Sequence, residues 1–242
     1  MSYCKIFRLV PALLMILINS SVLAESNSGM SYSVRVIGGS WTGKNTETGD
    51  EFRSTTGSQL GLNVAYQTGR FYTGLNFQGG EYKFEKEAPN QVTSASATVP
   101  VYNDIITRSE LDLVFGYYLS KHFSMFLDLK STNSRWESNA YEQQYAGVGI
   151  GIAGYWPLGD DWTLHGSFGA ILAGEVTHND EKIADGVSSG LDFGALYSLK
   201  GGHRIMFGLK SSAYEYEFTN GDFQRHDVAG IYLGYNYAFS MN

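Results

Sequence analysis

Apolar residues alternate with polar or small residues over most of the chain after Ala24, and helical periodicity is scarce there. In residues 231–239, Ile, Leu, Tyr, Tyr and Phe occupy one face, whereas Tyr, Gly, Asn and Ala occupy the other. Because successive side chains of a strand point to opposite faces, each such segment is predicted to be a strand. Ten strands are predicted, at roughly 31–41, 57–68, 71–83, 105–119, 122–133, 143–157, 161–176, 186–199, 203–218 and 225–240.

The connections between these segments alternate between short and long. The short ones are 69–70, 120–121, 159–160 and 200–202, and the long, polar ones are about 42–56, 84–104, 134–142, 177–185 and 219–224. Short turns at one end and long loops at the other are typical of an outer-membrane barrel. The predicted fold class is therefore all-β: a transmembrane antiparallel up-and-down β-barrel of about ten strands, with eight or twelve as alternatives. An even number of strands puts both ends of the barrel on the short-turn, periplasmic side.

A soluble β-sandwich is the competing interpretation, since its strands also alternate. Its apolar face is buried, however, and its turns follow no rhythm of short and long. Here aromatic residues gather beside the short turns: Tyr66, Phe71, Tyr117, Phe123, Trp156, Trp162, Tyr197, Tyr237 and Phe239. An aromatic girdle at a membrane interface belongs in this place, which favours the membrane barrel.

The N-terminus has the order of a secretory signal peptide. Lys5 and Arg8 precede an apolar run over 9–18, and a stretch of small residues ends at Ala24. The run is too short for a spanning helix, although an uncleaved N-terminal anchor is the alternative. Residues 1–24 are therefore predicted to be a cleaved signal peptide, and residues 25–242 the barrel.

Composition narrows the class of protein further. The chain has 29 Gly, 17 Tyr and 14 Phe among 242 residues, with 17% charged residues and a formal net charge of −7. It is too apolar for a disordered chain, and its acidic pI near 5.2 argues against a nucleic-acid partner. Cys4, the single cysteine, lies in the expected signal peptide, so a disulfide framework or cysteine-built zinc site is excluded. No metal or cofactor is expected.

The final strand carries a motif. Gly234 is followed by Tyr237 and Phe239 at alternating positions, and three more residues complete the chain. This pattern resembles the C-terminal assembly signal of Gram-negative outer-membrane proteins, which usually ends at the aromatic residue itself. The resemblance implies insertion into the cell outer membrane by the outer-membrane assembly machinery, with membrane lipid and lipopolysaccharide as neighbours. It implies no activity.

If the apolar face meets lipid, the other face lines the lumen. That face would carry a network of nearly balanced charges: Arg35, Arg108, Glu110, Asp112, Asp128, Lys130, His165, Glu175, Asp192 and Lys210. Eight strands are about filled by their own side chains, so ten lie near the filled end of the range. A salt-bridged plug is the first interpretation. A narrow wet pore and a ligand cradle at the extracellular mouth are the alternatives.

Enzymes also occur among barrels of this size. Outer-membrane proteases need acidic residues and a His–Asp pair at the extracellular rim. Glu110 and Asp112 share one face of a strand, but adjacent His226 and Asp227 point to opposite faces, which is the wrong geometry for a pair. The alternative for Glu110 and Asp112 is membership of the charge network.

Lipid-A-modifying hydrolases need a Ser or His–Ser constellation facing the outer leaflet. His165 and Ser167 share a face, but that face is the lumen, and His203 lies at a periplasmic turn. The run His178 to Glu181 has oxygen and nitrogen ligands for a divalent cation, with a solvated loop tip as the ordinary interpretation.

The sequence therefore predicts an integral outer-membrane protein with a structural or surface-recognition role through its extracellular loops, since loops on a rigid scaffold carry binding function. A narrow channel for small solutes and an outer-membrane hydrolase are the alternatives. No residue pattern in the loops identifies an extracellular ligand.

Overall fold

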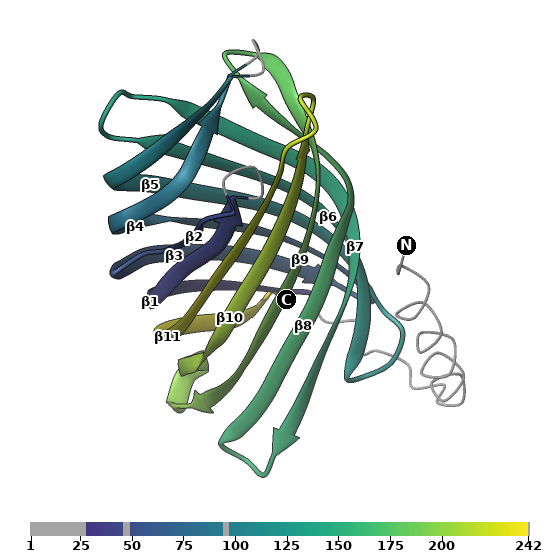
Figure 1. Cartoon of the computed structure of the whole chain (residues 1–242). Helices are drawn as coiled ribbons and strands as arrows, with labels where there is room; N and C mark the ends of the chain where they lie inside the picture. Colours follow the sequence, from purple (N-terminus) through teal and green to yellow (C-terminus); the bar gives the residue numbers. More distant parts are fainter. Residues whose placement is uncertain (1–27, 46–48, 94–96, 242) are drawn as a thin grey trace.

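The computed structural model describes residues 28–45, 49–93 and 97–241 as an antiparallel β-barrel (Figure 1). Its elements are β1 (Ser28–Asn45), β2 (Glu51–Arg53), β3 (Thr56–Thr68), β4 (Phe71–Val92), β5 (Thr98–Tyr118), β6 (Phe123–Trp136), β7 (Glu142–Leu158), β8 (Trp162–His178), β9 (Glu181–Ser198), η2 (Lys200–Gly202), β10 (His203–Phe218) and β11 (Phe223–Met241). Ten long strands form the wall, and the short β2 pairs only with the end of β1. The predicted fold class and strand number are confirmed.

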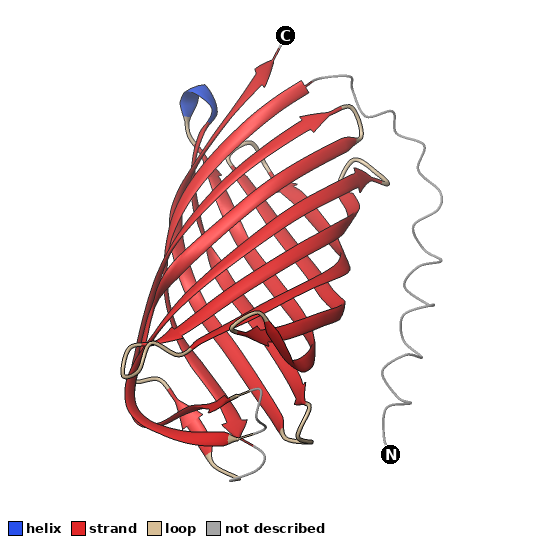
Figure 2. Cartoon of the chain, turned by 90° about the horizontal axis from the view of Figure 1, so that it is seen from above, coloured by secondary structure: helices blue, strands red, loops and turns tan. Residues whose placement is uncertain are grey.

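The barrel closes between its first and last strands. β11 pairs with β1 along its whole length, from Ser28 opposite Met241 to Asn45 opposite Gln224. Every other long strand pairs with its neighbours in sequence, and the strands run obliquely around the barrel (Figure 2). Both ends of the described wall and η2 lie at the short-turn end (Figure 2). The expected signal peptide, residues 1–24, lies outside the described residues.

The strands extend farther at the opposite end, the mouth, than the sequence predicts. The expected loop 84–104 is largely strand, because β4 continues to Val92 and β5 begins at Thr98. The expected loop 177–185 reduces to a tight turn at Asn179 and Asp180, whose φ angles are 51° and 63°. Two successive residues with positive φ make the turn that matches the twist of paired strands. Both loop predictions were wrong for the same reason: polar strand ends outside the apolar band resemble loops.

A band of apolar side chains faces outward around the barrel. Its members are exposed: Val36, Leu60, Leu62, Leu75, Phe77, Leu111, Phe115, Leu127, Leu129, Val148, Ile150, Phe168, Leu172, Leu191, Phe193, Phe207, Leu209, Ile231 and Leu233. A water-soluble protein rarely leaves so large a continuous apolar surface open. Aromatic pairs border the band at the short-turn end, such as Phe71 with Tyr117 and Trp162 with Tyr197, whose ring centroids are 5.0 and 4.9 Å apart. Among the described residues, no helix is long and apolar enough to cross a membrane.

Candidate functional site: the lumen and its closed mouth

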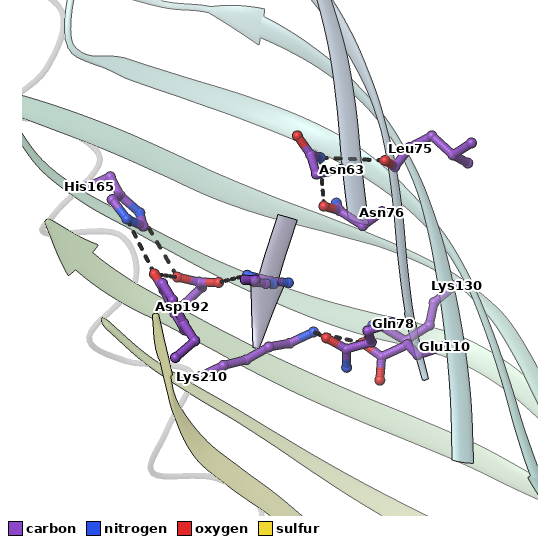
Figure 3. A network of polar contacts seen from close by, with 11 residues as sticks. Asn63, Leu75, Asn76, Gln78, Glu110, Lys130, His165, Asp192 and Lys210 are labelled. Carbon is purple, nitrogen blue, oxygen red and sulfur yellow. Dashed lines mark hydrogen bonds and ion pairs between the residues drawn. The ribbon is translucent and has the colours of Figure 1, made fainter. Parts of the chain in front are cut away.

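A layer of charged side chains crosses the middle of the lumen, with Glu110 at its centre (Figure 3). The Nζ atoms of Lys130 and Lys210 lie 2.9 and 3.0 Å from Glu110 Oε1, and Tyr214 donates its hydroxyl hydrogen to Oε2 over 2.7 Å. Lys130 also reaches Asp112 Oδ1 at 2.5 Å. Glu110 is 3% exposed, so these contacts replace the water that its carboxylate would otherwise need. The layer links β5, β6 and β10 across the barrel.

A second group of charges lies on the β1–β11–β9 side (Figure 3). Arg35 Nη1 lies 2.9 Å from Asp192 Oδ2, and the Tyr232 hydroxyl donates to Asp192 Oδ1 over 2.8 Å. His165 Nδ1 is 3.9 Å from the same oxygen. Gly61 provides space for the arginine, because a Cβ atom there would lie 2.8 Å from Arg35 Cγ. The small residue on the neighbouring strand therefore lets the long side chain lie along the wall.

The structure places three of the predicted lumen residues outside these two groups. Arg108 is buried nearer the mouth, and Asp128 lines a cavity with its Oδ1 atom unpartnered among the described residues. Glu175 is exposed on the outer surface, so the expectation that it faces the lumen was wrong. The register shifts between Ile171 and Gly174, and this bulge reverses the alternation of the strand beyond it.

Within the described part of the chain, the two larger cavities of the lumen lie toward the short-turn end. A cavity of about 670 Å³ lies there, lined by residues such as Tyr72, Tyr118 and Arg204. A second cavity of about 260 Å³ reaches the charged layer, and His165 and Ser167 line both cavities. Space for water therefore extends from the short-turn end to the middle of the barrel.

The half of the lumen nearer the mouth is filled by side chains. The mouth cluster consists of Trp41, Phe52, Tyr82, Phe84, Ala88, Val101, Ile106, Trp136 and Tyr141. The β8–β10 cluster consists of Val92, Tyr145, Ile171, Val176, Ile183, Ala184, Tyr214, Tyr216 and Phe218. Both clusters include residues of the β4–β5 hairpin, so the hairpin is part of the core rather than an extension above it.

The end of the β4–β5 hairpin folds over the mouth. We call residues 84–93 and 97–104 the mouth hairpin. The register of its strands shifts twice, between Phe84 and Glu87 and between Ala88 and Gln91, where bulges bend the strands. Residues Ala88 to Val92 are all buried. The hairpin thus leaves the direction of the wall and enters the core.

Side chains from other strands bind the backbone of the mouth hairpin. Asn45 Nδ2 donates to the Ala88 carbonyl oxygen over 3.2 Å, and the Asn90 N–H donates to Asn45 Oδ1 over 3.1 Å. Trp136 Nε1 donates to the Pro89 carbonyl oxygen over 3.1 Å. Pro89 and Asn90 lie within the second register shift, where the ladder with β5 is interrupted, so side chains satisfy backbone groups there.

Further contacts bind the hairpin on other sides of the mouth. Gln224 Nε2 of β11 donates to the Asn90 carbonyl oxygen over 3.1 Å. Thr98 donates its hydroxyl hydrogen to Asp222 Oδ2, in the β10–β11 turn, over 2.5 Å. The hairpin therefore spans the mouth and closes it. Sequence reasoning missed these residues, since buried Asn and Gln in strand ends look like ordinary loop residues.

The protease-like candidates do not form a catalytic pair. His226 is 2% exposed and its Nδ1 accepts a hydrogen bond from Trp41 Nε1 over 3.2 Å. Asp227 points to the other face, where it accepts a hydrogen bond from Arg225 Nε over 3.0 Å. Glu110 is bound by lysines, as described above.

The remaining candidates also have other partners. His165 and Ser167 line the lumen cavities. His178 stacks on Tyr141 with ring centroids 4.4 Å apart, its Nδ1 lies 2.7 Å from the Glu142 carbonyl oxygen, and Asn179 bonds its Nε2. Both ring nitrogens are thus occupied. Within the described part of the chain, no group of three or more His, Cys, Asp or Glu residues could hold a metal ion.

Comparison with known proteins identifies the fold. No family model matches the chain, and no curated protein matches it. Among solved structures, the outer-membrane protease OmpT from Escherichia coli matches 92% of this chain and 100% of its own, with a TM-score of 0.57 and 11% identity. This chain has the fold of a Gram-negative outer-membrane β-barrel. At this identity the likeness extends to the fold alone.

Weaker matches have other roles. The COG4313 outer-membrane channel from Pseudomonas putida F1 covers 88% of this chain and 96% of its own, at 11% identity and a TM-score of 0.45. The β domain of the Bordetella autotransporter BrkA covers 89% and 100%, at 15% identity and a TM-score of 0.40.

Proposed function

We propose that the chain is an integral outer-membrane protein that does not conduct, and that it presents a closed surface to the outside of the cell. The observation that carries this proposal is the position of the mouth hairpin. It lies over the half of the lumen that the mouth cluster and the β8–β10 cluster fill. A small barrel with a packed interior has no continuous path for a solute. In this proposal residues 1–24 are cleaved, and the short-turn end faces the periplasm.

The outer side of the mouth hairpin supports a recognition role. Val99 and Tyr102 are 46% and 55% exposed although their neighbours Val101 and Asp104 are buried. An exposed aromatic residue on a rigid support is a common anchor for a partner. In this arrangement lipopolysaccharide and membrane lipid surround the wall of the barrel.

The assembly machinery is a further proposed partner. Gly234 lies opposite Arg35 in the β1–β11 seam, where a Cβ atom would lie 2.5 Å from the Val34 carbonyl oxygen. Tyr237 and Phe239 follow on the same strand, with ring centroids 5.7 Å apart. These positions support a role for the last strand in closing the barrel, as the assembly-signal motif implies.

Conductance across planar bilayers tests the main proposal. The purified, refolded protein should insert without producing single-channel steps, whereas a porin treated identically should conduct. Stable steps from the wild-type protein, changed in size by Asp128→Ala, would overturn the proposal, because Asp128 lines the inner cavity.

A gated narrow channel is the second candidate. The two adjoining cavities favour this candidate, because together they leave room for water from the short-turn end to the charged layer. Passage would then require the mouth hairpin to leave the barrel and the aromatic clusters to rearrange. This candidate predicts conductance only when the hairpin is detached.

A further inference from the structure

A small cavity lies between the mouth cluster and the β8–β10 cluster, in the filled half of the lumen. It measures about 10 Å³, enough for one water-sized particle. Its lining residues are Trp41, Arg108, Thr132, Ser134, Trp136, Gln143, Tyr145, Tyr216 and His226. They come from β1, β5, β6, β7, β10 and β11, so side chains of six strands surround the cavity.

Four polar side chains of this lining have an atom without a hydrogen-bond partner among the described residues. The atoms are Arg108 Nη2, Thr132 Oγ1, Gln143 Nε2 and His226 Nε2. The four residues are only 3%, 2%, 5% and 2% exposed, respectively. Buried polar groups are nearly always satisfied, so four such atoms around one cavity indicate a shared ligand.

All four atoms can donate a hydrogen. Arg108 and Gln143 present N–H groups, and the Thr132 hydroxyl rotates freely. His226 Nδ1 accepts the Trp41 Nε1 hydrogen over 3.2 Å, which leaves the ring hydrogen on Nε2. The cavity is therefore surrounded by donors.

The Arg108 guanidinium also lacks a direct counter-ion. Trp41 and Tyr214 lie over it, with their ring centroids 5.0 and 4.6 Å from Cζ, and Nη1 donates to Ser134 Oγ over 3.1 Å. Neighbouring Glu110 is bound by the two lysines instead, and no ion pair within 4.0 Å involves Arg108 among the described residues. A buried cation requires a nearby negative charge.

We infer that these four donors bind one small monovalent anion, of the size and charge of chloride. A water molecule accepts about two hydrogen bonds and would leave two donors unsatisfied, whereas a halide accepts all four and neutralises Arg108. Polyatomic anions do not fit the cavity. The ion ties β5, β6, β7 and β11 together directly beneath the mouth hairpin, and so stabilises the closed mouth.

Halide substitution tests the site directly. Crystals of the full barrel grown in sodium bromide should show an anomalous bromine peak within hydrogen-bond distance of Arg108 Nη2 and His226 Nε2. An electron-density peak in the cavity without anomalous signal would be water. That result, or the absence of any peak there, would overturn the inference.

Thermal unfolding provides the matching test in solution. The midpoint of wild-type unfolding should rise with chloride in a saturable manner, compared with sodium gluconate at equal ionic strength, because a ligand that binds only the folded state stabilises it. Gluconate is too large for the cavity. Identical midpoints in the two salts at every concentration would contradict the inference.

Two variants separate anion binding from a general salt effect. Thr132→Val removes one donor at constant shape and should weaken the chloride dependence about tenfold. Gln143→Glu supplies a carboxylate beside Arg108 and should abolish the chloride dependence. Unchanged dependence in Thr132→Val overturns the inference even if Gln143→Glu does not fold.

Discussion

The Tyr141 hydroxyl makes two hydrogen bonds with the backbone of one residue, Val92. It donates to the Val92 carbonyl oxygen over 2.6 Å and accepts from the Val92 N–H over 3.2 Å. Burial raises the pKa of Tyr141 to about 12, so the hydroxyl retains the proton that it donates. A side chain in the β6–β7 connection therefore replaces a strand partner for the buried tip of β4.

Tyr141→Phe should loosen the mouth hairpin without unfolding the barrel. Leaving both Val92 groups unpaired costs about 1–3 kcal/mol, so the hairpin should detach at least about fivefold more often. Limited proteolysis of the folded protein should show correspondingly faster cleavage between residues 84 and 104. Tyr102→Phe is the matched control, since Tyr102 is 55% exposed. Equal cleavage of both variants would show that the Tyr141 bonds do not hold the hairpin.

A cysteine pair at Thr98 and Asp222 should join the hairpin to the opposite side of the mouth. Their side-chain oxygens lie 2.5 Å apart, so short side chains of the hairpin and of the β10–β11 turn meet at this point. Cys4 is the only native cysteine and lies in the predicted signal peptide, so no other thiol competes in the mature chain. The double variant should form an intramolecular disulfide on oxidation, visible as faster gel migration of the denatured protein that a reductant reverses.

Each single cysteine variant is the control and should show no such shift. Failure of the double variant to cross-link would mean that the hairpin does not span the mouth. The same variant distinguishes the two proposed functions. A gated channel should conduct in the reduced form and be silent in the oxidised form, whereas a permanently closed barrel is silent in both.

Alternation was sufficient to predict the wall, because lipid outside and a polar lumen inside impose period two on every strand. It failed at Glu175, since a bulge of one residue reverses the faces and leaves no mark in a sequence of small and apolar residues. The pairing of Arg35 with Asp192 is a cross-barrel contact between residues 157 positions apart, so the sequence indicated inward charges but no partners. The mouth hairpin was missed because its few buried apolar residues stand among Asn, Gln and other polar residues, and its contacts with the other strands run mostly through backbone groups.

Glu110→Gln should destabilise the barrel strongly. The substitution leaves Lys210 without its ion-pair partner and removes one of the two partners of Lys130, in a layer that water barely reaches. Removing one member of a buried ion pair costs about 3–5 kcal/mol. Urea unfolding of the refolded barrel in detergent should show a lower midpoint. Glu175→Gln, on the exposed surface, should change the free energy of unfolding by no more than about 0.5 kcal/mol. Similar losses in both variants would contradict the central role of Glu110.

Arginine substitutions of two similarly exposed residues can test which part of the barrel surface faces lipid. Leu191 is 53% exposed within the apolar band, and Val99 is 46% exposed on the mouth hairpin. An arginine on the lipid face near the bilayer midplane costs about 2–4 kcal/mol, whereas one outside the bilayer costs almost nothing. Leu191→Arg should therefore lower the stability of the barrel folded into lipid vesicles, and Val99→Arg should leave it unchanged. The difference in stability between the two variants should disappear in detergent micelles, because a micelle can rearrange around the charged side chain. If Val99→Arg were the more harmful change in vesicles, the mouth hairpin would lie in the bilayer, and the band described here would not be the membrane-facing surface.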